Sequence, residues 1–189
     1  MLARFSILLL ALSLAACSSS RSMIPQTKIY VLDSDLIAST DKQNATKVML
    51  SRISIADYLD SQNLMIRKQG NEVSFARYHQ WAERLPSLIH RSLMASLNRT
   101  NDSVLFVDQC DACAQIAVHI DHFYPNYEGD VVLAGIFEVL SSTGHAQQSQ
   151  PFLLKQTQTS DGYTASVALM IKLLDLLGGE IAEVLVTGD

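Results

Sequence analysis

The sequence lacks several features that would point directly to a biochemical activity. Its 14 lysines and arginines are outnumbered by 19 aspartates and glutamates, which leaves a net charge of −5. Nucleic-acid binding needs clustered basic side chains, so this balance argues against a DNA or RNA partner. Gly-x-Ser-x-Gly, His-Glu-x-x-His and Gly-x-x-x-x-Gly-Lys motifs are also absent. We therefore expect neither an enzyme nor a bound cofactor.

Long apolar runs are scarce as well. The run over residues 5–14 is the length of a signal-peptide core, and it is far short of the roughly 20 residues that a membrane-spanning helix needs. Arg4 precedes this run and Cys17 follows it. The segment 14–17, Leu-Ala-Ala-Cys, resembles a lipobox, in which the chain is cut before a cysteine that carries diacylglycerol. We predict a lipoprotein signal peptide over residues 1–16.

Cys17 would then anchor the mature chain through covalent diacylglycerol and a further acyl chain. Each buried methylene contributes about 0.8 kcal/mol, so two or three chains hold a protein stably on a bilayer. An ordinary signal peptide with a chance cysteine is the alternative, but the polar residues 18–22 are typical of a tether. Ser18, by resemblance to bacterial lipoproteins, favours the outer membrane. We assign residues 17–25 to the lipidated tether and 26–189 to one globular domain.

Short runs rich in Val, Ile, Leu and Tyr predict strands in this domain. A Gly70-Asn71 pair between two of them indicates a hairpin. The polar segment 141–150 is expected to connect the last two strands. The predicted strands cover residues 28–32, 47–53, 64–67, 72–75, 104–107, 114–124, 131–140 and 152–154.

Two segments have helical periodicity instead. Apolar residues recur every four positions from Trp81 to Leu97, which predicts an amphipathic helix. Pro86 lacks a backbone donor, so this helix either begins near Leu85 or begins at Tyr78 and is kinked. A second helix is expected after residues 160–161, continuing weakly past the glycines at 178–179. The prediction is an α+β domain with a largely antiparallel sheet packed against two main helices.

The order and spacing of three segments, 55–59, 64–67 and 79–85, resemble the PqiC-like family of ABC-type transport auxiliary lipoproteins. In that family a Tyr-Leu pair, here Tyr58-Leu59, follows an early strand. A Trp-Ala-Glu segment, here from Trp81 to Glu83 and followed by Leu85, opens the first helix. The resemblance implies that these residues are mostly structural.

The resemblance also implies a role at the periplasmic face of the outer membrane. Such proteins act with an MCE-domain, PqiB-like protein that spans the periplasm in intermembrane lipid transport, so this chain would be its docking or adaptor subunit. A homo-oligomer is compatible with that role. Two alternatives remain open: a carrier that binds lipid in its own cavity, and a periplasmic thiol redox protein.

Cys110 and Cys113 have the spacing of a redox pair, but a strand follows them rather than a helix N-terminus. A disulfide is favoured in an oxidising periplasm, with free thiols and redox catalysis as alternatives. Strand alternation would place His119 and Asp121 on one face and His122 on the other, which argues against a metal site. Trp81 is expected in the core rather than at a ligand site.

Overall fold

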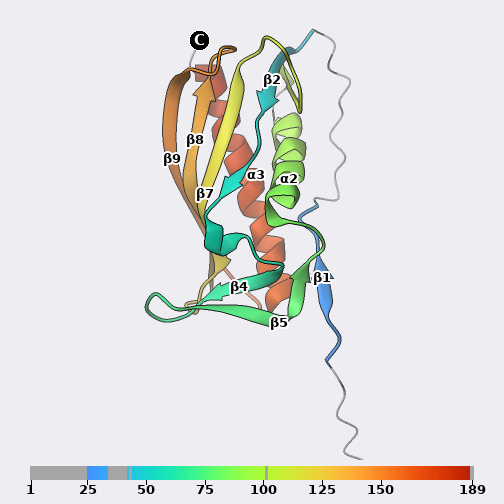
Figure 1. The fold of residues 1–189 in the computed structure, drawn as a ribbon, viewed down its shortest axis with the longest axis vertical. Coiled ribbons are helices and arrows are strands. Elements are labelled where there is room, and N and C mark those ends of the chain that lie inside the picture. The colour runs from blue at the N-terminus through green and yellow to red at the C-terminus, as the bar shows by residue number, and fades with distance from the viewer. Residues whose placement is uncertain (1–24, 34–41, 43, 101, 188–189) are drawn as a thin grey trace, which may run out of the picture.

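Two β-sheets and two helices make up the domain in a computed structural model, which describes residues 25–33, 42, 44–100 and 102–187 (Figure 1). The predicted signal peptide and Cys17 lie outside the described residues. The elements in chain order are β1 (Lys28–Tyr30), β2 (Thr46–Leu50), β3 (Ser54–Ile55), the 3₁₀ turn η2 (Asp57–Leu59), β4 (Asn63–Arg67), β5 (Val73–Trp81), α2 (Leu85–Thr100), β6 (Val104–Val107), β7 (Gln115–Pro125), β8 (Asp130–Leu140), β9 (Ala146–Thr157) and α3 (Tyr163–Thr187).

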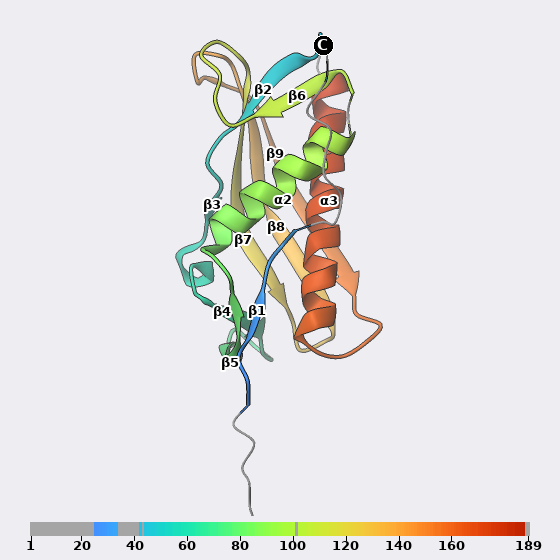
Figure 2. The same cartoon turned by 90° about the vertical axis from the view of Figure 1, so that its right-hand side faces the viewer.

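The larger sheet has the strand order β6-β2-β7-β8-β9, and β3 pairs with β7 as well. The long strands β7, β8 and β9 form an antiparallel meander, whereas β2 and β3 run parallel to β7. The smaller sheet, β1-β5-β4, combines one parallel and one antiparallel pair. Figure 2 shows both helices on the same face of the larger sheet. The predicted α+β class is confirmed, with mixed sheets in which antiparallel pairing predominates.

The core lies between the two helices and the inner face of the larger sheet. Burying one large apolar side chain is worth about 1.5–3 kcal/mol, so this layer supplies much of the stability. Residues with no exposed surface come from both helices and from the sheet: Leu88, Ile89, Leu93 and Leu97 of α2, Leu173, Leu174, Leu177 and Ile181 of α3, and Val131, Leu133 and Phe137 of β8.

None of the helices in the described part of the chain has both the length and the apolar composition needed to span a membrane.

The first helix begins at Leu85, which confirms one of the two predicted starts. β5 instead continues to Trp81, and a short turn separates the strand from α2. Pro86 lies in the first helical turn, where a backbone donor has no partner in any case. Trp81 and Leu85 are four residues apart without sharing a helix, so the helical spacing there is a coincidence.

The start of the last strand also differs from expectation, whereas the second helix continues past its glycines as predicted. β9 begins at Ala146, so several polar residues expected in a loop pair with β8 instead, Ser149 opposite Glu138 for example. Residues 146–149 are exposed on both faces of this edge strand, which is why they show no apolar alternation. The second helix continues through Gly178 and Gly179 to Thr187, and Gly178 lies directly against Ser96 of α2.

Candidate functional site

Three of the family-motif residues are core residues. Leu59, Trp81 and Leu85 are 3%, 4% and 3% exposed, and they line one small internal cavity beneath η2. The cavity also touches Phe123 of β7 and Met170 of α3. These motif residues therefore bring η2, the end of β5 and the start of α2 onto the main core.

Tyr58, the fourth motif residue, is partly exposed and fastens η2 to β7. Its hydroxyl donates to the carbonyl oxygen of Asp121 and lies 2.8 Å from Nδ1 of His122. Burial raises the pKa of Tyr58 to about 12, and the charges of Tyr124 and Asp121 act in the same direction. The phenol is therefore a neutral donor at any physiological pH.

The predicted placement of the histidines on opposite faces of the strand is wrong. A bulge at Asp121 shifts the register of β7, so His119 lies opposite Ile136 and His122 opposite Ala134. Ile136 and Ala134 are two residues apart on β8, which places both imidazoles on the outer face of the sheet. Even so, no group of three or more potential ligands for a metal ion occurs among the described residues.

The contacts among Ser54, His119 and Asp121 resemble the Ser-His-Asp arrangement of a hydrolytic triad. The Ser54 Oγ is 2.8 Å from Nδ1 of His119, and Nε2 of that ring is 3.4 Å from an Asp121 carboxylate oxygen. However, the Ser54 hydroxyl is also within 3.3 Å of the carbonyl oxygen of Val118, and about half of both the His119 and Asp121 side chains is exposed to water. An activated nucleophile and its base instead lie in a shielded site. These contacts join β3 to β7.

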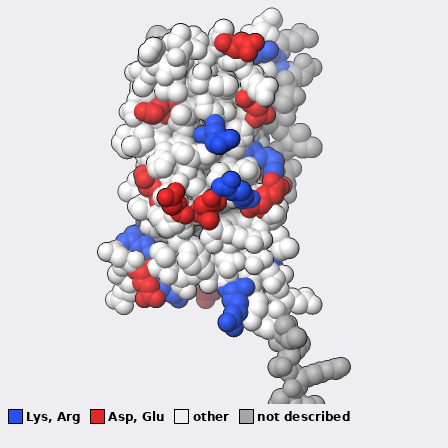
Figure 3. Space-filling model, viewed as in Figure 1, with Lys and Arg blue, Asp and Glu red and all other residues white. Residues whose placement is uncertain are grey.

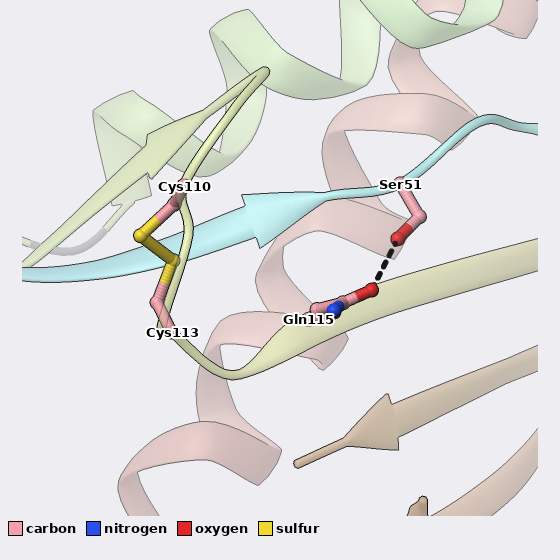
Figure 4. The surroundings of a disulfide bond; sticks show 4 residues. All are labelled: Ser51, Cys110, Cys113 and Gln115. Carbon is pink, nitrogen blue, oxygen red and sulfur yellow. Dashed lines mark hydrogen bonds between the residues drawn. A yellow bond between two sulfur atoms is a disulfide. The ribbon is translucent and has the colours of Figure 1, made fainter. Parts of the chain in front are cut away.

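Cys110 and Cys113 form a disulfide in the loop between β6 and β7 (Figure 4). Beside the loop, Ser51 donates a hydrogen bond of 3.3 Å to the side-chain oxygen of Gln115, at the start of β7. No helix begins at either cysteine, so the feature that lowers a redox thiol's pKa is missing. The disulfide therefore constrains the approach of the chain to β7.

A groove of about 840 Å³ lies between the segment around β3 and η2 and the N-terminal half of α2. Figure 3 views this face and shows acidic and basic side chains interspersed across its middle. Its apolar part includes Ile53 and Met94, and its charged part includes the side chains of Arg52, Asp57, Asp60, Arg84, His90, Arg91 and Asp108.

Ion pairs neutralise most of the charge along the groove. Arg84 contacts Asp60 at 2.6 Å, and Arg91 contacts Asp33 at 3.0 Å and Glu83 at 3.2 Å. Arg91 donates hydrogen bonds to Glu83 and Asp33, and these bonds raise its pKa above the ordinary value, so Glu83, the fifth motif residue, fixes the start of α2 through a permanent cation.

Arg52 is different from the other two groove arginines, because it makes no ion pair with any described residue. An open groove that combines apolar residues, several ion pairs and an unpaired guanidinium suits a protein segment better than a small substrate. Sequence reasoning missed this groove because its residues come from separate segments that share no motif.

Both the sequence and the fold of this chain are similar to those of known proteins. Residues 30–182 match the family described as "ABC-type transport auxiliary lipoprotein component". A solved structure of an uncharacterized protein has a TM-score of 0.74 and 20% identity, covering 84% of this chain and 98% of that one. A Xanthomonas campestris protein of the DUF330 family has a TM-score of 0.69 and 17% identity, covering 86% and 97%. No curated protein matches the sequence.

Proposed function

Because the chain belongs to the family of ABC-type transport auxiliary lipoprotein components, as its motifs predicted, we propose that it is the docking subunit of an intermembrane lipid transport system of the MCE, PqiB-like type. The family match across residues 30–182 is the observation that carries this proposal. In this role the domain sits at the periplasmic face of the outer membrane and receives the end of a periplasm-spanning MCE-domain protein.

Lipidation of Cys17 supplies the membrane attachment that this role needs. The family is one of lipoproteins, and the lipobox-like segment lies directly before Cys17. Replacing Cys17 with Ala should leave a folded domain that no longer fractionates with membranes, because the acyl chains are gone. Outer and inner membranes separated on a density gradient provide the readout for the wild-type protein. Recovery of the Cys17→Ala protein in the membrane fractions would mean that a different anchor holds it.

The groove beside α2 is the surface that we assign to the MCE-domain partner. Arg52 is the residue to change, because it has no internal ion pair to break and charge reversal should leave the fold intact. Arg52→Glu should weaken binding of the purified partner about tenfold, a loss of about 1.4 kcal/mol that is typical of one charged contact. Lys172→Glu, on an exposed position of α3 outside the groove, is the matched control.

Binding is measured by biolayer interferometry with the partner's periplasmic domain immobilised. Equal loss in both variants would indicate a general charge effect, and no loss in either would place the partner elsewhere on the domain. Failure of the wild-type chain to bind at all would contradict the docking role itself.

The two alternative functions predict different results. A lipid carrier needs an enclosed apolar cavity, but the cavity beneath η2 has a volume of only about 10 Å³, the size of a single water molecule. We therefore expect the delipidated domain to retain no phospholipid when analysed by mass spectrometry. A thiol redox protein would reduce insulin in the presence of dithiothreitol, and we expect no such activity because neither cysteine lies at a helix N-terminus.

A further inference from the structure

We propose that the end of the domain nearest the tether is a second membrane contact, which inserts into the headgroup region of the bilayer that holds Cys17. This contact end consists of β1, the β4–β5 hairpin and the turn 126–129 between β7 and β8. The inference rests on the proposed lipid anchor, and it adds a surface that orients the domain on the bilayer.

The length of the tether limits how far this end can lie from the membrane. Pro25, the first described residue, is eight residues after Cys17. A fully extended chain spans at most about 3.6 Å per residue, so Pro25 lies within about 29 Å of the lipidated cysteine. β1 begins three residues later, and Figures 1 and 2 show it beside the hairpin at the same end of the molecule.

Apolar and aromatic side chains are exposed at this end. Phe75 on β5 is 45% exposed, and Tyr127 in the turn is 53% exposed. Ile29 on β1 and Val73 on β5 are exposed as well. The turn and the hairpin are joined, since the Tyr127 amide donates to the carbonyl oxygen of Arg67 at 2.9 Å. Tyrosine is favoured at the bilayer interface because its ring is apolar and its hydroxyl polar, and phenylalanine is common on the buried side of interfacial segments.

Exposed basic side chains occur on the same segments, although the chain as a whole is acidic. Lys28, Lys68 and Arg77 are exposed and make no ion pair with any described residue. Glu72 and Glu128 are the acidic residues of the same segments, which leaves the basic groups in excess. Cations beside exposed aromatics complement a surface of anionic phospholipid, where each basic residue contributes about 1 kcal/mol. A surface that binds a protein could lie anywhere on the domain, whereas a second membrane contact must lie within reach of the tether, as this end does.

Quenching of tryptophan fluorescence by brominated lipid tests the contact directly. The full lipidated protein is reconstituted into vesicles of phosphatidylethanolamine and phosphatidylglycerol whose acyl chains carry bromine. Phe75→Trp places a reporter at the contact end. Leu153→Trp, at a 73% exposed position on β9, is the matched control, and the single native tryptophan, Trp81, is buried and gives the baseline.

We expect the Phe75→Trp emission to shift to the blue and to lose roughly half its intensity, because an interfacial indole lies close to the brominated chains. The Leu153→Trp and wild-type signals should stay unquenched. Adding Lys68→Glu and Arg77→Glu to the Phe75→Trp protein should reduce the quenching in anionic vesicles.

Flotation of the same vesicles distinguishes a failure of the second membrane contact from a failure of the lipid anchor. If the protein floats with the vesicles and Phe75→Trp is quenched no more than Leu153→Trp, the second contact is wrong and the lipid anchor stands. If the protein does not float, the anchor fails and the contact fails with it. If Phe75→Trp responds only when the MCE-domain partner is added, this end binds protein rather than lipid.

Discussion

Gly178 and Gly179 are adjacent in α3, yet replacement by alanine should affect them in opposite directions. A Cβ atom at Gly178 would lie 3.0 Å from the Ser96 Cβ of α2 and overlap its hydroxyl oxygen, whereas a Cβ at Gly179 meets nothing within 4 Å. Neither glycine has a positive φ angle. The pair therefore isolates the close approach of the two helices from the general effect of glycine on a helix.

The expected changes in the free energy of unfolding follow from three contributions. Alanine is favoured over glycine in a helix interior by about 1 kcal/mol, and Gly179→Ala should gain up to that amount. At Gly178 the same gain is offset by overpacking, which costs about 1–3 kcal/mol. Rotation of the Ser96 hydroxyl also breaks its 3.3 Å bond to the Asp175 carbonyl oxygen, at a further cost of about 1 kcal/mol. Gly178→Ala should therefore destabilise the domain by about 1–3 kcal/mol.

Thermal unfolding followed by circular dichroism at 222 nm measures the difference. For a domain of this size 1 kcal/mol corresponds to about 2–4 °C, so a difference of about 2–4 kcal/mol between the two variants should separate their Tm values by about 4–16 °C, with Gly179→Ala the more stable. Equal Tm values would mean that α2 and α3 do not approach each other at Gly178. The packing of the two helices on the sheet would then need revision.

Three further predictions concern stability. The Lys155 ammonium lies 2.6 Å from the Asp130 carboxylate and holds the pKa of Asp130 below its usual value of 3.8. This pair therefore stabilises the fold above about pH 4, and the stabilisation is lost as the pH falls through the lowered pKa. Asp130→Asn should reduce the fall of Tm with decreasing pH in the acid range. Replacing Cys110 and Cys113 with Ser opens a four-residue loop, so urea unfolding should show a loss of about 2 kcal/mol or less, and a larger loss would mean that the loop holds β7 in place. Trp81→Ala should cost about 3–5 kcal/mol in the same assay because the ring is buried, and a cost below 1 kcal/mol would contradict its place in the core.

The central strands could be predicted because their sequence pattern reflects their burial. β7 alternates apolar and polar residues, and β8 is almost wholly apolar, as strands packed under helices are. The bulge at Asp121 has no such pattern, because it depends on the pairing of β7 with β8. Strict alternation therefore placed His122 on the wrong face.

The end of β5 and the groove could not be predicted for related reasons. Trp81 and Leu85 are both buried, but one ends a strand and the other begins a helix, and spacing alone does not distinguish these cases. The groove combines Arg52 with residues of α2 more than 30 positions away. Tertiary packing alone brings them together, so the sequence predicted the family but not the surface that would bind a partner.

Purification of the lipidated wild-type chain from gently solubilised membranes, with mass spectrometry of everything that accompanies it, tests the docking role most directly. The cells must express the candidate MCE-domain protein, and the Arg52→Glu chain is purified in parallel. The account predicts that the MCE-domain protein is recovered with the wild-type chain and is depleted with Arg52→Glu. Recovery of the wild-type chain from the outer membrane without any MCE-domain protein would contradict it.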